Sequence, residues 1–264
     1  MVWLYQDKNR REYAVKQISK KSLTSESAIN LAKKEINIIN YLRNFSDINE
    51  DGNLSNANET IIFLEDYYED AFDLWLIFEK GGNTLSSLLF KIKGEFVGNE
   101  RIYNIQKGIL LKKLTDTSNN TLLLQDFIKR ILQFLKFLKD KGVVHCDLKP
   151  ENILIDYDFD ENNEIYIKRL KIIDFGSSIF LHSPENFCSN TPEYLCPEIN
   201  EVIEKNISKT ELTSFIKSLN PWCMDMWSLG VIILEIIMSC PLWMSYKAKT
   251  IMNGKVTELI NKIR

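Results

Sequence analysis

The feature that most constrains the fold is a helix, a polar loop and a short strand that follow one another between residues 121 and 155. Residues 121–141 carry apolar side chains at helical spacing along one stripe. Lys141 and Gly142 then form a signal for the end of a helix. The polar loop 145–152 comes next and runs directly into a short apolar strand. This order predicts a mixed α and β structure that presents polar groups on an irregular loop.

The loop carries three side chains that suit one kind of chemistry. Asp147, Lys149 and Asn152 place a carboxylate, an amine and an amide within six residues. Phosphoryl transfer needs a group that orients and deprotonates a hydroxyl, a cation for the phosphate, and an oxygen ligand for Mg²⁺. Asn152 and Leu154 share one face of the strand, so one can meet a metal while the other lines a base pocket.

A second acidic position follows about twenty residues later. The apolar strand 170–173 ends in Asp174, Phe175 and Gly176. A strand end that faces a cleft is a natural place for a metal-binding carboxylate, and the glycine permits a sharp exit of the backbone. We therefore interpret Asp174 as a second candidate metal ligand.

Composition excludes several classes of protein. The 264 residues carry a net charge of −3, which gives no electrostatic reason to expect nucleic acid or an anionic membrane as partner. The five cysteines are odd in number and lack C-x-x-C spacing, so a reducing compartment is expected. The first residues lack a secretion signal, and we expect a cytoplasmic protein, with the nucleus also open.

The most apolar stretch, residues 226–244, is interrupted by Glu235 and Pro241. Its uninterrupted part is too short to span a bilayer, so we interpret it as a fully buried core helix.

Residues 1–80 read as strands plus one helix. Strand-like alternation covers 13–18, a helix is predicted over 24–43, and strands are predicted at 61–64 and 74–78. The polar stretch 46–53 between them is interpreted as a mobile insertion.

The sequence after Gly81, Gly82 and Asn83 is expected to be mainly helical. Two polar stretches within it, 156–163 and 200–219, are interpreted as surface excursions. We therefore expect an α+β fold with a small strand-rich lobe at 1–80 and a larger, mainly helical lobe at 81–264.

Six segments in this order resemble the protein-kinase family across nearly the whole chain. The segment Ala14-Val15-Lys16 matches the strand that carries the nucleotide lysine, and Glu35 matches the ion-pair partner of that lysine. The other matching segments are the strand entering the hinge at 76–79, the catalytic loop at 145–152, the metal motif at 174–176, the end of the activation segment at 190–198, and the start of the central helix at 225–230.

The resemblance implies the two-lobed protein-kinase fold and transfer of the ATP γ-phosphoryl group to a protein substrate. Lys149 and Thr191 favour serine or threonine over tyrosine, since Thr191 is expected to hydrogen-bond to Asp147 and Lys149. The expected partners are ATP, Mg²⁺ and a protein with an acceptor hydroxyl, with no nucleic acid and no membrane. The sequence leaves the oligomeric state open.

The same resemblance assigns roles to single residues. Asp147 is expected to act as base and Lys149 to neutralise the γ-phosphate, while Asn152 and Asp174 hold Mg²⁺. Lys16 is expected to hold the α- and β-phosphates and Glu35 to position it.

The adenine pocket is expected between Ala14 and Leu154. In this scheme, backbone groups of Glu79 and Gly81 recognise the adenine base. Phe78 stands at the gatekeeper position, and Val2 falls on the valine that follows the glycine-rich loop.

The resemblance also implies an internal column of Ile39, Leu64, His145 and Phe175, anchored by Asp225. His145 is thus expected to be structural rather than catalytic.

Three features depart from the family pattern. No G-x-G-x-x-G precedes Lys16, and Cys146, which we expect to be inert, stands where many kinases have the arginine that receives an activating phosphate. The chain also stops soon after residues 241–243, without the arginine expected to pair with a buried Glu198. We therefore expect a kinase domain truncated at both ends, with little or no activity as it stands.

Two alternatives remain. A pseudokinase or scaffold would use the same fold to bind partners without phosphotransfer. A small-molecule kinase of related fold is the other alternative, and it is disfavoured because residues 191–198 match a segment that shapes a peptide platform.

Overall fold

The structure is a computed structural model that describes residues 2–21, 25–44, 59–98, 100–116, 120–184, 187, 191–205, 208–242, 249–252 and 255–257. The polar stretch 46–53, expected to be a mobile insertion, lies outside the described residues, and so does Ser189.

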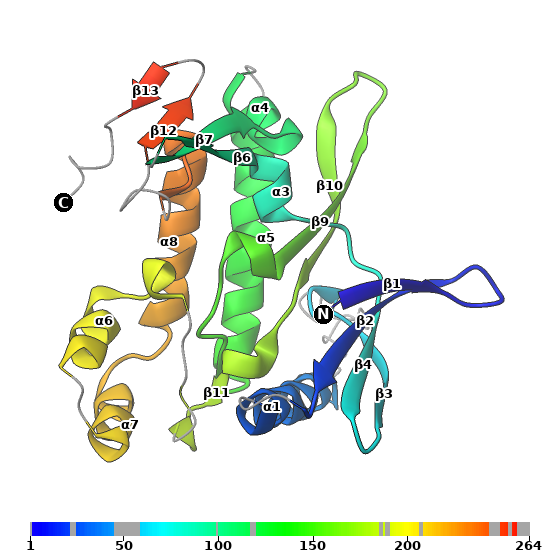
Figure 1. Cartoon of the computed structure of the whole chain (residues 1–264), viewed down its shortest axis with the longest axis vertical. Coiled ribbons are helices and arrows are strands. Elements are labelled where there is room, and N and C mark those ends of the chain that lie inside the picture. Colours follow the sequence, from blue (N-terminus) through cyan, green and yellow to red (C-terminus); the bar gives the residue numbers. More distant parts are fainter. Residues whose placement is uncertain are drawn as a thin grey trace.

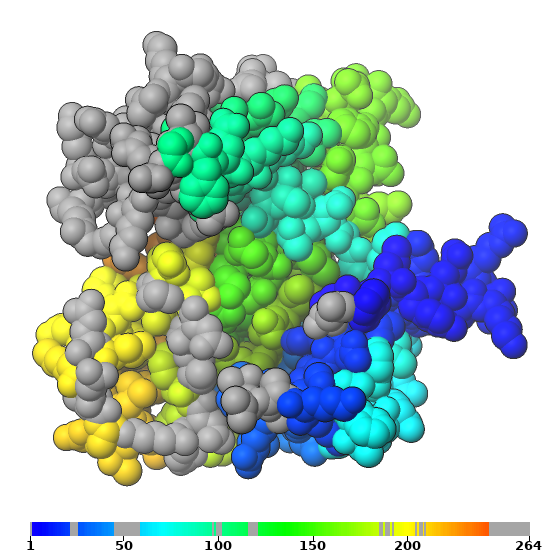
Figure 2. Space-filling model, in the orientation of Figure 1, coloured from blue at the N-terminus to red at the C-terminus, as the bar shows by residue number. Residues whose placement is uncertain are grey.

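The N-terminal part is a four-stranded antiparallel sheet with one helix. The strands, in the order β1-β2-β4-β3, are β1 (Val2–Gln6), β2 (Glu12–Ser19), β4 (Asp73–Glu79) and β3 (Leu64–Glu69). Alternate residues of β4 are buried, and they share one core with the buried face of helix α1 (Ser25–Asn44). The β1–β2 hairpin, drawn in blue, projects from the body of the molecule (Figure 2). The predictions of a helix at 24–43 and of strands at 13–18 and 74–78 are confirmed.

The predicted strand at 61–64 is only partly correct. Ile61 forms an isolated bridge with Ile172, and β3 begins at Leu64. The backbone N–H of Ile62 donates to the carbonyl of Ile172 at 3.1 Å. This segment therefore ties the N-terminal part to the strand that leads to Asp174, instead of extending the N-terminal sheet.

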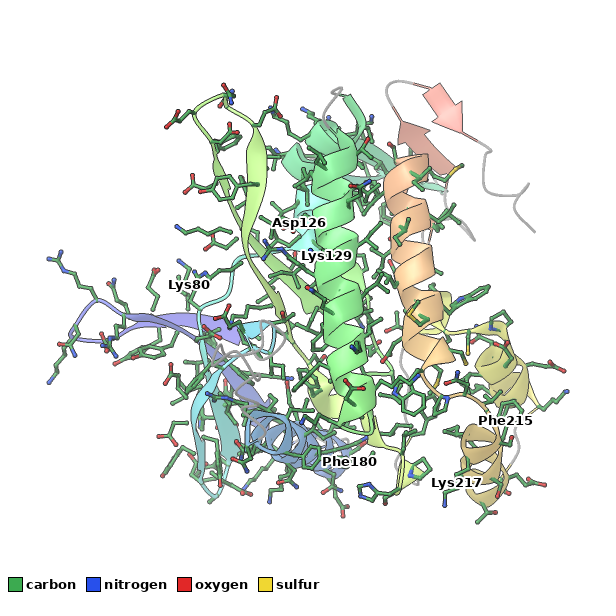
Figure 3. The ribbon with its side chains drawn as sticks, turned by 180° about the vertical axis from the view of Figure 1, so that it is seen from behind. Lys80, Asp126, Lys129, Phe180, Phe215 and Lys217 are labelled. Atoms are coloured by element: carbon green, nitrogen blue, oxygen red, sulfur yellow. The ribbon has the colours of Figure 1, made fainter. Side chains whose placement is uncertain are left out.

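Helices dominate the C-terminal part. The helix α5 (Asn120–Asp140) lies beside α8 (Cys223–Met238) at its centre (Figures 1 and 3). Shorter helices flank this pair: α3 (Leu85–Leu89), α4 (Ile109–Asp116), α6 (Pro197–Glu204) and α7 (Lys209–Ser218). The 3₁₀ turns that the structure fully describes are η1 (Pro150–Asn152), η2 (Phe175–Ser177) and η4 (Pro192–Tyr194). The helix predicted at 121–141 is confirmed to within one residue at each end.

The expectation of a fully buried helix at 226–244 is wrong. The helix α8 buries Leu229, Ile232 and Ile236, whereas Trp227 and Ile237 are exposed on another face. No single described helix is long and apolar enough to cross a membrane. Thr210–Ser218 and α8 would pass such a test only when joined, and they are bent by 77° relative to each other.

The C-terminal part holds more strand than the sequence indicated. The strands β6 (Phe90–Val97) and β7 (Glu100–Lys107) form an antiparallel hairpin, and β7 also pairs in parallel with β12 (Lys249–Met252). The sheet order is β13-β12-β7-β6, with β13 at Lys255–Thr257. The alternation of apolar and charged residues in Phe90-Lys91-Ile92-Lys93 is the pattern of a strand with one exposed face, and it was overlooked in the sequence.

The two polar stretches differ from the expectation to different degrees. Residues 160–164 form a turn, but β9 (Ile153–Phe159) and β10 (Ile165–Ile172) on either side are longer than predicted. Residues 200–219 are mostly helix α6 and helix α7. Ile216 of α7 is buried in a small second core with Met224, so this stretch is more than a surface excursion.

Short strands flank the loop 145–152 and fix its position. A two-residue strand, β5 (Asn83–Thr84), pairs with β9, and β8 (Val143–Val144) pairs with β11 (Ile179–Phe180). The loop 145–152 thus leaves β8 and enters β9, while β10 leads to Asp174.

A buried carboxylate anchors this loop to α8. Asp225 accepts hydrogen bonds from the backbone N–H groups of His145 at 2.8 Å and Cys146 at 2.9 Å. Cys146 has φ +66°, in the left-handed region that few residues other than glycine adopt. Burial raises the pKa of the Asp225 carboxyl, and the two N–H donors oppose this rise. The predicted anchoring role of Asp225 is confirmed.

The predicted internal column is buried throughout. Ile39, Leu64 and Phe175 belong to the same core, and the His145 ring meets the Phe175 ring edge to face with centroids 5.0 Å apart. His145 Nε2 lies 3.1 Å from the carbonyl oxygen of Ile173. His145 is therefore fixed in the interior, as expected for a structural residue.

The expectation of a buried, unpaired Glu198 is wrong. Glu198 is exposed in the first turn of α6, where a negative charge interacts favourably with the helix dipole. No desolvation cost arises at this position.

We predict that Asp225→Asn destabilises the fold. The amide has only one accepting oxygen for two buried donors, so the free energy of unfolding should fall by about 1–3 kcal/mol. Urea denaturation measures this difference, and Asp140→Asn at an exposed position of α5 is the control. Equal stability of the two variants would contradict the anchoring role.

Candidate active site

The loop brings its polar side chains together around one carboxylate. Thr191 Oγ1 donates to Asp147 Oδ1 at 2.8 Å, and Lys149 Nζ donates to Asp147 Oδ2 at 2.8 Å. Lys149 also donates to Thr191 Oγ1 at 2.7 Å. The expected bonds of Thr191 to Asp147 and to Lys149 are thus confirmed, and they close a triangle of three side chains.

Asn152 completes the support of this carboxylate. Its side-chain nitrogen donates to the Asp147 carbonyl at 2.8 Å and to Asp147 Oδ2 at 3.1 Å. Both residues are buried, with 5% of Asn152 and 7% of Asp147 accessible. Since its amide nitrogen is committed to Asp147, Asn152 keeps its amide oxygen as an acceptor.

A second polar cluster joins β2, α1 and the end of β10. Lys16 Nζ lies 2.8 Å from Glu35 Oε2 and 3.2 Å from Asp174 Oδ1. The predicted pairing of Lys16 with Glu35, which lie nineteen residues apart in the sequence, is confirmed. Burial acts to lower the pKa of the Lys16 ammonium, but Glu35 and Asp174 outweigh it and raise that pKa, so the lysine stays charged.

The carboxylate of Glu35 is only 2% accessible and is held from two sides. Burial raises its pKa, while Lys16 and the backbone N–H of Phe175 stabilise the charged form. Glu35 therefore links the lysine of the sheet to the segment that carries Asp174.

The backbone at Asp174 is unusual. Its φ of 66° and ψ of 67° lie in the left-handed region, and the side chain is 43% exposed. Gly176 lies close to α1: a Cβ placed on it would be 3.5 Å from the carbonyl oxygen of Leu31. This conformation carries the chain sharply out of β10 and leaves the Asp174 carboxylate accessible at the strand end.

The donor set suits a metal that is shared with a ligand. Within the described ranges, no group of three or more His, Cys, Asp or Glu side chains could hold an ion alone. Asn152 and Asp174 offer an amide oxygen and a carboxylate, which are the hard oxygen ligands that Mg²⁺ prefers. Mg²⁺ usually takes one or two protein ligands and completes its shell with water and substrate phosphates, so these residues fit it.

The residues expected around an adenine base come from four strands. Ala14 on β2 is opposite Phe78 on β4, and Val2 on β1 is opposite Lys16. A Cβ at Gly81 would overlap Cδ1 of Leu154, so the Leu154 side chain would have to turn away to admit one. The structure thus places Gly81 against Leu154, while Val2 is 65% exposed.

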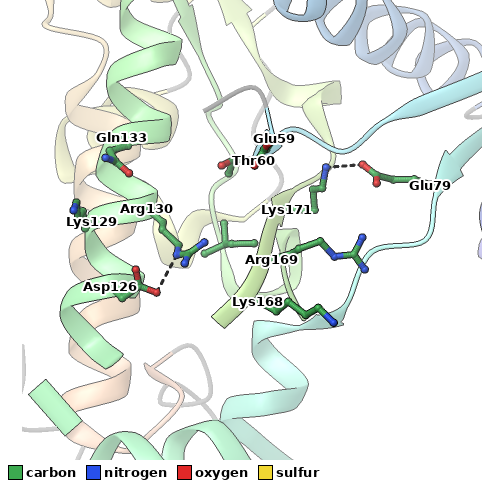
Figure 4. A pocket seen from close by; sticks show the side chains of 11 residues that line it. Glu59, Thr60, Glu79, Asp126, Lys129, Arg130, Gln133, Lys168, Arg169 and Lys171 are labelled. Atoms are coloured by element: carbon green, nitrogen blue, oxygen red, sulfur yellow. Dashed lines mark hydrogen bonds and ion pairs between the residues drawn. The ribbon is translucent and has the colours of Figure 1, made fainter. Parts of the chain in front are cut away.

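Two contacts near the site were missed in the sequence. Glu79 Oε1 accepts from Lys171 Nζ at 2.7 Å (Figure 4) and from the backbone N–H of Phe63 at 2.8 Å. The sequence predicts a role only for the backbone groups of Glu79. The inward position of Lys171 on β10, among apolar neighbours, was the available signal for a buried ion pair.

The other missed contact holds the segment after Thr191. Tyr194 Oη donates to both carboxylate oxygens of Glu235, at 3.2 and 3.1 Å, and the backbone N–H of Leu242 donates to Glu235 Oε1 at 2.8 Å. Burial, together with the Glu235 charge, raises the pKa of the Tyr194 hydroxyl. A lone glutamate within an apolar helix was the available signal for this contact.

Cys146 behaves as expected for an inert thiol. Its side chain is 3% accessible, and Sγ lies 3.6 Å from the Val144 carbonyl. Burial raises the pKa of this thiol well above its usual range, which opposes thiolate formation.

Comparisons with known proteins agree with this geometry. A family model described as the protein kinase domain matches residues 2–264. A probable inactive protein kinase of Arabidopsis thaliana is 25% identical over 201 residues, covering 67% of this chain and 51% of that protein. Calcium-dependent protein kinase 25 of the same plant is 29% identical over 237 residues, covering 88% of this chain and 34% of that protein.

The serine/threonine-protein kinase atg1 of Dictyostelium discoideum is 32% identical over 141 residues, which cover 52% of this chain and 17% of that protein. This chain therefore spans about half, or less, of the length of these relatives.

We predict that the triangle at Asp147 is energetically coupled. Thr191→Val removes one donor from Asp147 and one acceptor from Lys149, so a double-mutant cycle with Asp147→Asn should give a coupling free energy of about 0.5–3 kcal/mol. Chemical denaturation of the single and double variants measures it. Thr191→Ser keeps the hydroxyl and serves as control, and strictly additive effects of Thr191→Val and Asp147→Asn would contradict the geometry.

Proposed function

Because the kinase-domain model matches nearly all of it, this chain belongs to the protein kinase family, and we propose that it transfers the γ-phosphoryl group of ATP to serine or threonine hydroxyls of proteins. The observation that carries this proposal is the Asp147 carboxylate held by Thr191, Lys149 and Asn152. It positions a base and a cation on one loop.

The reaction assigns each of these groups one task. The acceptor hydroxyl oxygen attacks the γ-phosphorus, the bond from that phosphorus to the β–γ bridging oxygen breaks, and ADP leaves. Asp147 orients the hydroxyl and takes its proton. Lys149 lies 2.8 Å from Asp147, so its charge is available to the phosphoryl group as it transfers.

Lys16 would bind the α- and β-phosphates, with Glu35 fixing its ammonium. Asp174 and Asn152 would hold Mg²⁺, which neutralises phosphate charge when it is bound. The contact between Lys16 and Asp174 at 3.2 Å supports a shared phosphate and metal region.

The preference for serine and threonine rests on Thr191 and Lys149. The hydrogen bonds of Thr191 fix the end of the activation segment to the base, and Tyr194 holds the next turn to α8 through Glu235. A segment fixed at two points suits an extended peptide better than a small molecule. The relative named a serine/threonine-protein kinase supports this assignment.

A pseudokinase that binds partners without phosphotransfer is the second candidate. One relative is named a probable inactive protein kinase. The enzyme is favoured because all four expected polar residues are present and form contacts. Lys16 pairs with Asp174, and Asn152 donates to Asp147.

Two substitutions separate binding from chemistry. In a version of the protein extended at both ends, Asp147→Asn should lower kcat by roughly 10²–10⁴-fold, because the positioned base is lost, while Mg-ATP still binds. Asp174→Asn should instead weaken Mg-ATP binding. Initial rates with a generic protein acceptor and calorimetric titration with Mg-ATP measure the two effects, with Asp140→Asn as control. Phosphorylation that is unchanged by Asp147→Asn would refute the assignment.

We also predict that activity does not require phosphorylation of the activation segment. Cys146 replaces the arginine that usually receives such a phosphate, and its buried thiol cannot bind one. Phosphatase treatment, which would remove phosphate from Ser183 or Ser189, should leave the rate unchanged. A fall in the rate of more than about tenfold that rephosphorylation reverses would contradict this prediction. It would show that another cationic side chain binds the phosphate.

A further inference from the structure

Two cysteine side chains that take no part in the proposed chemistry meet between the end of the activation segment and α8. Cys196 is the N-cap residue of α6, and Cys223 is the first residue of α8. Both are free thiols, and both pack in the small second core. The Cys196 thiol donates a hydrogen bond to the sulfur of Cys223, so the two sulfurs are in direct contact.

This contact joins parts of the chain that are 27 residues apart in the sequence. The helices α6 and α7 run between them and lie beside the end of α8 at which that helix begins (Figure 1). Ile199 of α6 and Ile216 of α7 are buried in the same core as Cys196. The packing of three helices therefore holds the two sulfurs together.

The other described cysteines have different surroundings. The sulfur of Cys146 lies 3.6 Å from the carbonyl oxygen of Val144, and that of Cys240 lies 4.0 Å from the carbonyl oxygen of Pro241. Cys188 lies outside the described residues. Cys196 and Cys223 thus differ from Cys146 and Cys240 in having a thiol as the neighbour of the sulfur.

The two thiols differ in their access to a reagent. Cys196 is 1% accessible, whereas Cys223 is only partly buried. Burial raises the pKa of both thiols, while the backbone N–H of Ile199 opposes this rise at Cys196 and the Cys196 thiol opposes it at Cys223. Both groups therefore remain thiols at neutral pH until an oxidant reaches the more exposed sulfur, that of Cys223.

We propose that Cys196 and Cys223 form a redox modification site, at which a peroxide converts the two thiols into a disulfide. The Cys223 sulfur attacks one oxygen of hydrogen peroxide, the O–O bond breaks, and Cys223 becomes a sulfenic acid as one water leaves. The Cys196 sulfur then attacks the Cys223 sulfur, the S–O bond breaks, and a second water leaves. The two thiols lose two electrons and two protons, which the peroxide takes up.

The disulfide would fix the end of the activation segment to α8. Cys196 follows Tyr194, which is held by Glu235, and Cys223 lies two residues before Asp225, which holds the loop 145–152. The bond closes a loop that contains α6 and α7, and it restricts the unfolded chain more than the folded one. The oxidised chain should therefore be the more stable form, whether or not the protein transfers phosphate.

The test treats the folded chain with a small excess of hydrogen peroxide, blocks the remaining thiols with iodoacetamide, and digests the protein with a protease that cleaves after glutamate. Such cleavage places Cys196 in the peptide 194–198 and Cys223 in the peptide 212–235, and each of the other three cysteines falls in a peptide of its own. Mass spectrometry should find 194–198 joined to 212–235, and dithiothreitol should separate them. The melting temperature of the joined form should exceed that of the reduced form by about 5 °C or more.

The same treatment in urea shows whether the fold directs the pairing. The unfolded chain should favour Cys188 with Cys196, the closest pair in the sequence, because short loops close most readily. Cys196→Ser and Cys223→Ser should each abolish the joined peptides. Cys240→Ser, just past the other end of α8, is the matched control and should leave them unchanged.

The proposal is overturned if the folded chain yields no joined 194–198 and 212–235, or if either peptide joins to that of another cysteine instead. Identical pairing in the folded and the urea-unfolded chain would overturn it as well, and so would a melting temperature that does not rise on joining.

Discussion

The site depends first on the hydrogen bonds between Asp225 and the backbone of the polar loop. Asp225 lies on α8, eighty residues from His145, and its two oxygens accept the N–H groups of His145 and Cys146. Those bonds hold Cys146 at a positive φ, and the next residue is Asp147. The direction in which Asp147 leaves the loop is therefore set by a carboxylate that takes no part in the chemistry.

Two further buried carboxylates act in the same way. Glu35 joins the N-terminal sheet to the segment of Asp174 through Lys16 and the Phe175 backbone, and Glu235 joins the segment of Tyr194 to α8. Burying a charge is costly unless donors satisfy it, and each of these groups has at least two. Together the three connect elements that are distant in sequence, and the groups proposed for phosphoryl transfer lie between them.

The sequence predicted the parts of the molecule that local patterns encode. The helix α1, the strand β4 and the helix α5 follow from periodicity, and the resemblance to the protein-kinase family pointed to Lys16, Glu35, Asp147 and Asp174 as candidate site residues. It did not reveal contacts that depend on long-range packing, such as Lys171 with Glu79 or Tyr194 with Glu235. The exposure of Glu198 was also missed, because burial is not visible in a local pattern. The hairpin of β6 and β7 does carry a local signal, the alternation of Phe90-Lys91-Ile92-Lys93 before a Gly-Asn dipeptide, and this signal was overlooked.

The central claim is that these supported groups transfer a phosphoryl group to protein hydroxyls. The most direct measurement incubates a version of the protein that is extended at both ends, with a G-x-G-x-x-G segment before Lys16, together with ATP labelled at the γ-phosphate and Mg²⁺, offering serine, threonine and tyrosine peptides and small-molecule hydroxyls side by side. The account predicts label on serine or threonine of the peptides. Binding of Mg-ATP with no transfer to any acceptor would contradict it and identify a pseudokinase, and transfer to small molecules alone would contradict it in favour of a different kinase class.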